Sequence, residues 1–235
     1  MLNLLKRFFV RCSQIVLAFI VLTALAVLWH RWVNPDISAM MASQKLELQR
    51  EGASTVLQQQ WVDYTAIASP IKLAVIASED QEFPSHYGFD MEAIRKAWQA
   101  NQQGDDLRGA STITMQVAKN LYLWTDRTWL RKGLEAWFTL LIETLWSKQR
   151  ILEIYLNIAQ FDDRVFGVEA AANKFFNKPA AQLNRYEAAL LAVVLPAPEV
   201  YRVEAPSGYI RERQLWTLHQ MRRLGREHLV PVNAE

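Results

Sequence analysis

The stretch SPIKLAVIASEDQEFPSHYGFD, residues 69–90, joins an apolar helix to a dense group of ionisable side chains. Ser69 is a possible N-cap and Pro70 suits the first helical position, so we expect a helix with a broad apolar surface to start here. The C-terminal end of this helix delivers three acidic side chains in close succession, Glu79, Asp80 and Glu82.

These acids could serve chemistry or simply end the helix. Carboxylates held against an apolar wall tend to have a raised pKa and are suited to general acid and base catalysis. The alternative is a solvated acidic helix end that runs into a turn. His86 follows in the same segment. Alone, it is more typical of a structural hydrogen-bonding residue than of a metal ligand.

A second segment, GASTITMQVAKN at residues 109–120, places three hydroxyl side chains at a predicted helix start and then an amide and a lysine. Hydroxyls and free N–H groups at a helix start suit an anionic group such as phosphate. Ordinary N-capping is the alternative interpretation.

Basic residues follow this segment within twenty positions, namely Arg127, Arg131 and Lys132. Guanidinium groups bind phosphate bidentately and ammonium groups bind it as point charges, so this cluster could cradle a pyrophosphate. Arg131 and Glu135 have the i,i+4 spacing that shares one helix face. A solvated ion pair is the alternative for these two residues.

Helical periodicity continues along the chain, and no strand-length alternation competes with it, so the predicted fold class is mostly α. Asp90 should cap the first of these helices and Gly225 should close the last. The single cysteine, Cys12, excludes an intrachain disulfide and a four-cysteine zinc site. The predicted helices cover residues 91–102, 112–123, 129–146, 148–158, 167–176, 185–195 and 208–224.

The N-terminal region predicts a membrane anchor. The 18 residues from Cys12 to Trp29 carry no charge. As a helix they would span about 27 Å, close to the hydrocarbon thickness of a bilayer. Three basic residues precede the run and one, Arg31, follows closely, which predicts a cytoplasmic N-terminus and a single pass. A cleaved signal peptide is the alternative, since Ala24-Leu25-Ala26 has a small-x-small pattern.

Charge argues against one class of partner. Residues 30–235 carry 23 basic and 24 acidic side chains, so the region outside the apolar run lacks the basic excess typical of nucleic-acid binding. We expect no nucleic-acid partner.

Five strings resemble, in order and spacing, the successive motifs of family 51 glycosyltransferases, the peptidoglycan glycosyltransferases: EDQEFPSHYGFD, GASTITMQVAKN, RKGLE, KQRILEIYLN and GVEAAANKFFNK. The similarity covers about residues 60–225. Only about thirty residues follow Ala205, too few for the transpeptidase domain of the family's other common form. We therefore expect a monofunctional member from a Gram-negative bacterium.

The resemblance implies a lysozyme-like helical domain in the periplasm, tethered to the inner membrane. It also implies the reaction: polymerisation of lipid II by β-1,4 bond formation, with the nascent glycan on undecaprenyl diphosphate as donor. Other cell-wall synthesis proteins are possible partners. The organisation expected is a cytoplasmic start (1–11), a transmembrane helix (12–32), a connector (33–59), the catalytic domain (60–225) and a tail (226–235).

Residue roles carry over position by position. Glu79 takes the general-base role and Glu135 that of a second, supporting carboxylate. Met115, where the family often has Gln, and Asp162, where Gly is frequent, depart from the pattern and put local contacts in doubt. The positions that match sugar- or pyrophosphate-binding residues of the family are Ser111, Thr112, Gln116, Lys119, Arg127, Arg131 and Lys132.

The chemistry agrees with this reading. A prenyl diphosphate is a good leaving group that needs cations, and a sugar hydroxyl is a weak nucleophile that needs a base. No cofactor is required, although a divalent metal, Mg²⁺ or Mn²⁺, is possible at the diphosphate; no dedicated ligand cluster is visible. Two alternatives stay open, a lysozyme-like glycan-cleaving enzyme and a non-catalytic membrane-anchored scaffold. The basic cluster argues against the first.

Overall fold

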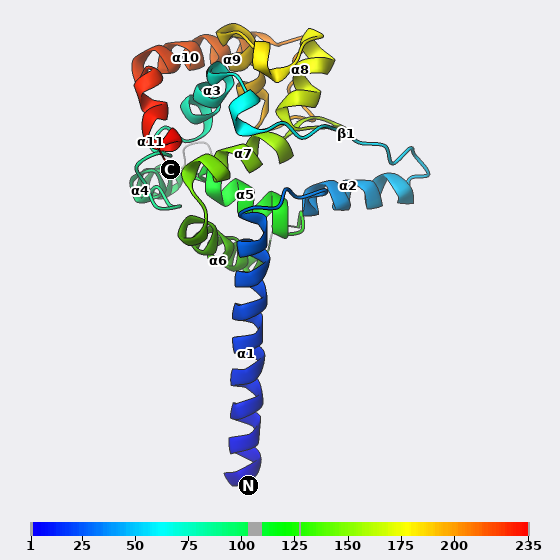
Figure 1. Ribbon diagram of the computed structural model, residues 1–235, viewed down its shortest axis with the longest axis vertical. Helices are drawn as coiled ribbons and strands as arrows, with labels where there is room; N and C mark the ends of the chain where they lie inside the picture. The colour runs from blue at the N-terminus through cyan, green and yellow to red at the C-terminus, as the bar shows by residue number, and fades with distance from the viewer. Residues whose placement is uncertain (1, 103–109, 127, 235) are drawn as a thin grey trace.

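The computed structural model describes residues 2–102, 110–126 and 128–234, with side chains except those of residues 2–4 and 101. A mostly helical domain sits on one long N-terminal helix, as predicted (Figure 1). In chain order the elements are α1 (Leu2–His30), α2 (Ala39–Arg50), β1 (Gln58–Gln59), the 3₁₀ turn η1 (Tyr64–Ala66), α3 (Ser69–Glu79), α4 (Met91–Gln102), α5 (Ile113–Tyr122), α6 (Trp129–Leu145), α7 (Lys148–Ile158), β2 (Gln160–Asp162), β3 (Val165–Phe166), α8 (Val168–Phe176), η2 (Ala180–Gln182), α9 (Arg185–Val194), α10 (Gly208–Leu224), η3 (Arg226–Leu229) and α11 (Val230–Asn233).

Local signals place most helix ends correctly. The Asp90 carboxylate accepts a hydrogen bond from the Ala93 amide at 2.8 Å, as expected of an N-cap. Gly225 ends α10 with a φ of 71°. Pro70 lies in the first turn of α3, as predicted, but the N-cap role predicted for Ser69 is wrong. The cap position is Ala68, and no side chain caps this helix start.

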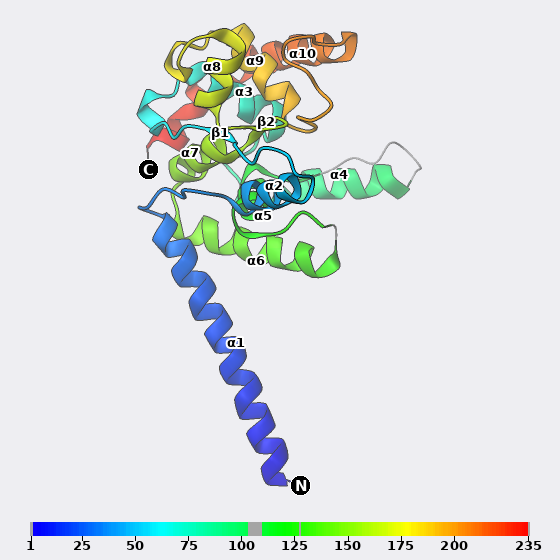
Figure 2. The same cartoon turned by 90° about the vertical axis from the view of Figure 1, so that its right-hand side faces the viewer.

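Helix α3 forms the centre of the core. Every residue from Ile71 to Ala77 is buried. The helix packs against α9 and α10, which close one end of the domain (Figure 2). Helix α7 is the second central helix and is buried along most of its length. The core thereby fixes the point at which α3 ends, which is Glu79.

A small three-stranded sheet, which the sequence pattern did not reveal, lies beside α8 in the otherwise helical fold. Strand β1 pairs with β3 in parallel, and β2 pairs with β3 in antiparallel orientation. Strands of two or three residues are too short for an alternating pattern to show in the sequence. Gly167 follows β3 at a φ of 80°, and a Cβ there would lie 2.7 Å from the Asn157 carbonyl oxygen, so only glycine fits.

The segment after the anchor folds onto the domain. Helix α2 packs on α5, and its Met41 is buried. The Gln44 amide donates a hydrogen bond to the Asp163 carbonyl oxygen at the turn between β2 and β3. Strand β1 then joins the sheet. The predicted connector is therefore held along its length by contacts with residues far away in sequence.

Helix α1 is, among the described residues, the one helix long and apolar enough to cross a membrane, over Leu5–His30. An anchor and a signal sequence would both meet this criterion. Its C-terminal end packs against the domain: Val27 is fully buried, and the Trp146 indole N–H donates to the Val27 carbonyl oxygen at 2.8 Å.

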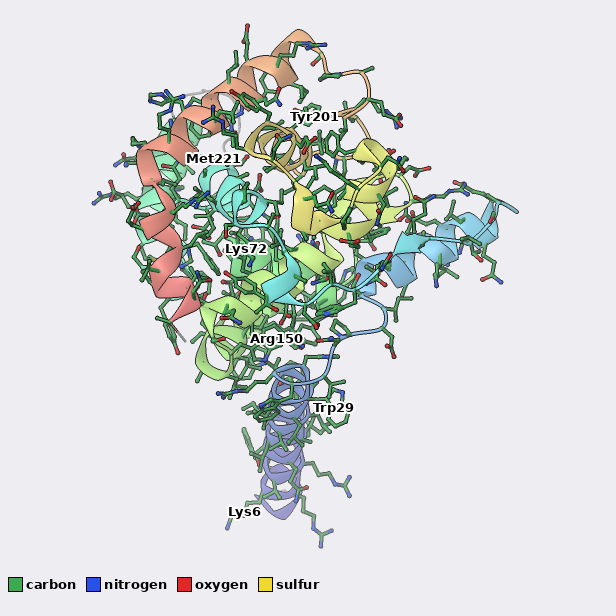
Figure 3. All side chains as sticks on the ribbon, turned by 45° about the horizontal axis from the view of Figure 1, so that its top comes forward. Lys6, Trp29, Lys72, Arg150, Tyr201 and Met221 are labelled. Carbon is green, nitrogen blue, oxygen red and sulfur yellow. The ribbon has the colours of Figure 1, made fainter. Side chains whose placement is uncertain are left out.

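Arg150 of α7 closes the end of α1. Its guanidinium donates to the His30 carbonyl oxygen at 3.0 and 3.1 Å and to the Val33 carbonyl oxygen at 3.1 Å (Figure 3). The last carbonyls of a helix lack partners within it, and a cation there also complements the helix dipole. This contact joins the N-terminal helix firmly to the domain.

Candidate active site

Glu79 is the last residue of α3, so the buried core helix sets its position. The residue is partly exposed, but protein surrounds its carboxylate closely, and this desolvation raises the pKa of Glu79 above its ordinary value. Hydrogen bonding from Gln116 and the more distant charge of Arg213 act in the opposite direction. The predicted acidic cluster is thus not a uniformly solvated helix end, because Glu79 has the environment of a general base.

A hydrogen-bond chain orients the Glu79 carboxylate. The Gln116 side-chain N–H donates to Glu79 Oε2 at 2.9 Å. The hydroxyl of the fully buried Tyr155 donates to Gln116 Oε1 at 3.1 Å and so fixes the direction of the amide. The α5 and α7 side chains therefore hold the acid that α3 delivers.

Asp80 occupies the helix start that the sequence suggested for a phosphate. Its Oδ2 accepts a hydrogen bond from the Ile113 amide at 2.9 Å, at the N-terminus of α5. His86 Nε2 lies 2.9 Å from both Asp80 oxygens, which confirms the structural role expected for the histidine. The Asp80 carboxylate therefore takes the Ile113 amide that the sequence analysis offered to an anion.

Of the three predicted hydroxyl side chains, two make structural hydrogen bonds and one lines a hollow. Thr112 is the N-cap of α5, as the N-capping alternative expected, and its hydroxyl also donates to the Gly88 carbonyl oxygen at 2.7 Å. Thr114 donates to Glu143 at 2.5 Å inside the core. Ser111 alone among the three lines the hollow described next.

A hollow of about 310 Å³ lies between α5, the start of α6 and the start of α2. It brings together the predicted residues Gln116, Lys119, Arg131, Lys132 and Glu135. Arg127 lies outside the described residues. The hollow also contains residues that the sequence did not single out: Met40, Asn120, Leu123, Trp124 and Thr125. Asn120 is the last residue of the predicted motif, and Leu123 to Thr125 follow it closely, whereas nothing in the sequence connects Met40 with it.

The ion pair of Arg131 with Glu135 is buried, so the solvated alternative is wrong. Arg131 Nη1 lies 2.9 Å from Glu135 Oε2, and the two side chains are 11% and 4% exposed. Lys132 Nζ lies 2.5 Å from the other Glu135 oxygen and is about half exposed. Glu135 thereby holds both cations in place at the wall of the hollow.

Two buried polar atoms of this hollow have no partner among the described residues, Arg131 Nε and Asn120 Oδ1. A buried guanidinium N–H without an acceptor is costly, and a phosphate oxygen is a suitable acceptor for it. The cationic hollow therefore has both the charge and a vacant donor for an anionic group.

A second hollow of about 230 Å³ borders Glu79 on the other side of Ser111. Acids and hydroxyls line it, including Asp80, Asp90 and Thr112. Because Ser111 lines both hollows and Gln116 contacts Glu79 from the first, Glu79 lies at the junction of a cationic and an acidic compartment.

The two departures from the family pattern have defined places. Met115 is buried and lines the cationic hollow. Asp162 lies in the small sheet, where it pairs with Lys174 at 2.5 Å and with Arg202 at 3.0 Å. Asp162 thus ties the sheet to α8 and to the segment before α10, at a distance from the hollows.

Comparison with known proteins agrees with this geometry. The family model described as Transglycosylase matches residues 47–222. A biosynthetic peptidoglycan transglycosylase of Xanthomonas oryzae pv. oryzae (strain KACC10331 / KXO85) is 49% identical over 227 residues, which cover 94% of this chain and 93% of the relative. A protein of the same name from Salmonella agona (strain SL483) is 52% identical over 221 residues, which cover 91% of this chain and 91% of the relative. Another from Pasteurella multocida (strain Pm70) is 52% identical over 212 residues, which cover 90% of this chain and 86% of the relative. The chain belongs to the transglycosylase family.

Proposed function

We propose that this protein is a peptidoglycan glycosyltransferase of cell wall biosynthesis, which polymerises lipid II and releases undecaprenyl diphosphate. The observation that carries the proposal is the position of Glu79, a carboxylate of raised pKa at the junction of a cationic and an acidic hollow. A hydrolase of glycans has no diphosphate to bind, so the buried cations favour transfer over cleavage.

The reaction divides between the two compartments. Glu79 takes the proton from the 4-hydroxyl of the acceptor sugar, and the oxygen attacks the anomeric carbon of the donor. The bond from that carbon to the diphosphate breaks, and Lys119, Arg131 and Lys132 stabilise the charge that develops on the leaving diphosphate. Glu135 contributes by fixing two of these cations.

We infer that the protein itself needs no resident cofactor. Both Glu135 oxygens already accept from cations, and among the described residues no three acidic, histidine or cysteine side chains are placed to hold a metal ion together. A Mg²⁺ or Mn²⁺ ion that assists the reaction would accordingly be ligated mainly by the diphosphate oxygens and water.

The direct test is an assay of purified full-length protein with labelled lipid II in detergent. Glycan polymer that a muramidase can digest is the expected product. Cleavage of preformed glycan without polymerisation would support the lytic alternative. Failure to consume either substrate, under conditions in which the chain is folded, would support the scaffold.

The Gln116–Tyr155 chain predicts a pH effect. Hydrogen bonding from Gln116 stabilises charged Glu79 and lowers its pKa, so Gln116→Ala should raise that pKa further. A base must be deprotonated to act; the acidic limb of kcat/KM against pH should therefore move to higher pH. Tyr155→Phe, which frees the amide, should move it the same way by less. An unmoved limb in both variants would contradict this positioning role.

We propose further that α1 stays as an inner-membrane anchor, with a cytoplasmic N-terminus and a periplasmic domain. The Lys/Arg bias supports the orientation. The exposed apolar side chains of α6, Trp129, Leu130 and Leu140, lie on a helix that packs beside α1 and suit the membrane surface. Both substrates carry a prenyl chain in the membrane, so a tether raises their effective concentration.

Two truncations separate anchoring from packing. Removing residues 1–20 should leave a folded enzyme that is less efficient and depends more on added lipid or detergent. Removing residues 1–30 also deletes Val27 and the His30 carbonyl, which contact Trp146 and Arg150, and should lower the thermal unfolding temperature as well. N-terminal sequencing that finds a mature start near Val27, or a reporter that places the C-terminus in the cytoplasm, would refute the topology.

A further inference from the structure

A hollow of about 270 Å³ lies away from the candidate active site, where α10 passes the starts of α3 and α9. Its walls are apolar and include Pro70, Leu73, Leu218 and Met221. Arginines from three separate segments surround these walls, namely Arg185, Arg222 and Arg226. We call this feature the arginine groove.

The exposed face of α10 extends the arginine groove. Arg211, Leu215, Leu218 and Arg222 are spaced i, i+4, i+7 and i+11, so they form one line along the helix. Leu215 is 66% exposed, which is unusual for a leucine beside an apolar hollow. The line places two leucines between two arginines, so a segment with apolar side chains between carboxylates would match it.

The arginines of the groove, like Arg211, form no close ion pair among the described residues. Arg185 lies over the ring of Tyr186 and donates to its hydroxyl at 3.0 Å, which is a neutral contact. Among the described residues, no carboxylate lines the hollow itself, and that of Glu227 lies beside Gly225 at its edge. Such a surface is complementary to carboxylates.

The location separates this surface from the membrane. In Figure 3, Met221 in the groove lies in the upper part of the domain, and Trp29 lies below the domain, where α1 leaves it. Helices α9 and α10 also form the end of the domain far from the free end of α1 in Figures 1 and 2. A lipid headgroup is therefore poorly placed to reach the arginine groove, whereas another protein has free access.

We propose that the arginine groove binds an acidic segment of a partner protein, with a leucine-sized side chain in the hollow and flanking carboxylates on Arg222 and Arg226. The apolar walls supply a desolvated anchor, and the arginines set the orientation of the segment. The interaction is independent of the catalytic compartments, because none of the groove residues lines either of them.

The test is fluorescence anisotropy of the full chain in detergent with a labelled probe peptide that carries two leucines flanked by glutamates. Wild-type protein should bind the probe in a salt-sensitive manner. The double variant R222E/R226E should bind at least about tenfold more weakly, since hydrogen bonds between charged groups are worth that much. L215S should weaken binding more modestly. The matched control R50E changes an exposed arginine at the end of α2 and should bind as wild type.

R222E/R226E should polymerise lipid II at the wild-type rate, which checks that the variant is folded. Leu215 is exposed, so L215S tests the groove independently of the arginines. Equal binding by R222E/R226E and R50E would overturn the proposal, as would equal binding of a probe with both leucines replaced by serine. If phosphatidylglycerol vesicles displaced the probe from the wild-type protein, and if R222E/R226E lost this effect, the groove would be assigned to lipid. That result would also overturn the proposal.

Discussion

Glu79→Gln should lower the rate of lipid II polymerisation by about 10²–10⁴-fold, because the substitution keeps the shape of the side chain and removes the proton acceptor. Stability should not fall with it. Burial raises the pKa of Glu79, so the folded state favours the neutral form, and the charged form costs stability at neutral pH. A neutral glutamine removes that cost. The polymerisation rate in steady-state assays should therefore fall, while the thermal unfolding temperature should not.

The matched control for this substitution is Glu82→Gln. Glu82 belongs to the same acidic segment, is exposed, and accepts a hydrogen bond from Ser85 at the surface. Its loss should leave both rate and stability close to wild type. A polymerisation rate near wild type for Glu79→Gln, with the protein folded, would remove Glu79 from the mechanism.

Glu135→Gln should affect stability and activity together. Glu135 is 3% exposed and neutralises Arg131 and Lys132, so the substitution leaves a buried guanidinium without a charged partner. Breaking one side of a buried pair costs about 3–5 kcal/mol. The freed cations also lose their fixed position at the diphosphate, and displacement of about 1 Å can cost 10²-fold in rate.

Urea unfolding and polymerisation kinetics measure the two effects. Glu92→Gln is the control, since Glu92 pairs with Lys96 at 2.7 Å on an exposed face of α4. Exposed pairs of this kind contribute little to stability, so this variant should be nearly silent. If Glu135→Gln were as stable and as active as Glu92→Gln, the buried pair would have neither of the roles described here.

Local sequence signals accounted for the helices because such signals act over a few residues. The Asp90 cap, the Pro70 start and the Gly225 stop each specify backbone geometry in their own turn. Ser69 failed as a cap because capping depends on where the chain turns into the helix, and the turn falls at Ala68. The strands could not be predicted from the sequence, because two or three residues are too few to show an alternating pattern.

The sequence predicted the types of chemical group in the candidate site better than it predicted their positions. The acids and cations were recognised, and Glu79, Arg131 and Glu135 lie in suitable surroundings. At the start of α5, where the sequence suggested an anionic group, Asp80 folds back onto the Ile113 amide. This contact joins residues thirty-three positions apart, and the periodicity of the sequence does not report such contacts.

The sequence by itself determined that the chain is mostly helical, has one apolar N-terminal helix and carries the ordered motifs of a glycosyltransferase, because these features depend on residue type and short spacing. The tertiary structure decided which carboxylate is desolvated, that the ion pair of Arg131 with Glu135 is buried, and that Met40 joins the cationic hollow. It also placed three arginines from separate segments around an apolar hollow beside α10. These properties depend on which distant segments exclude water from one another, and that is fixed only when the helices pack.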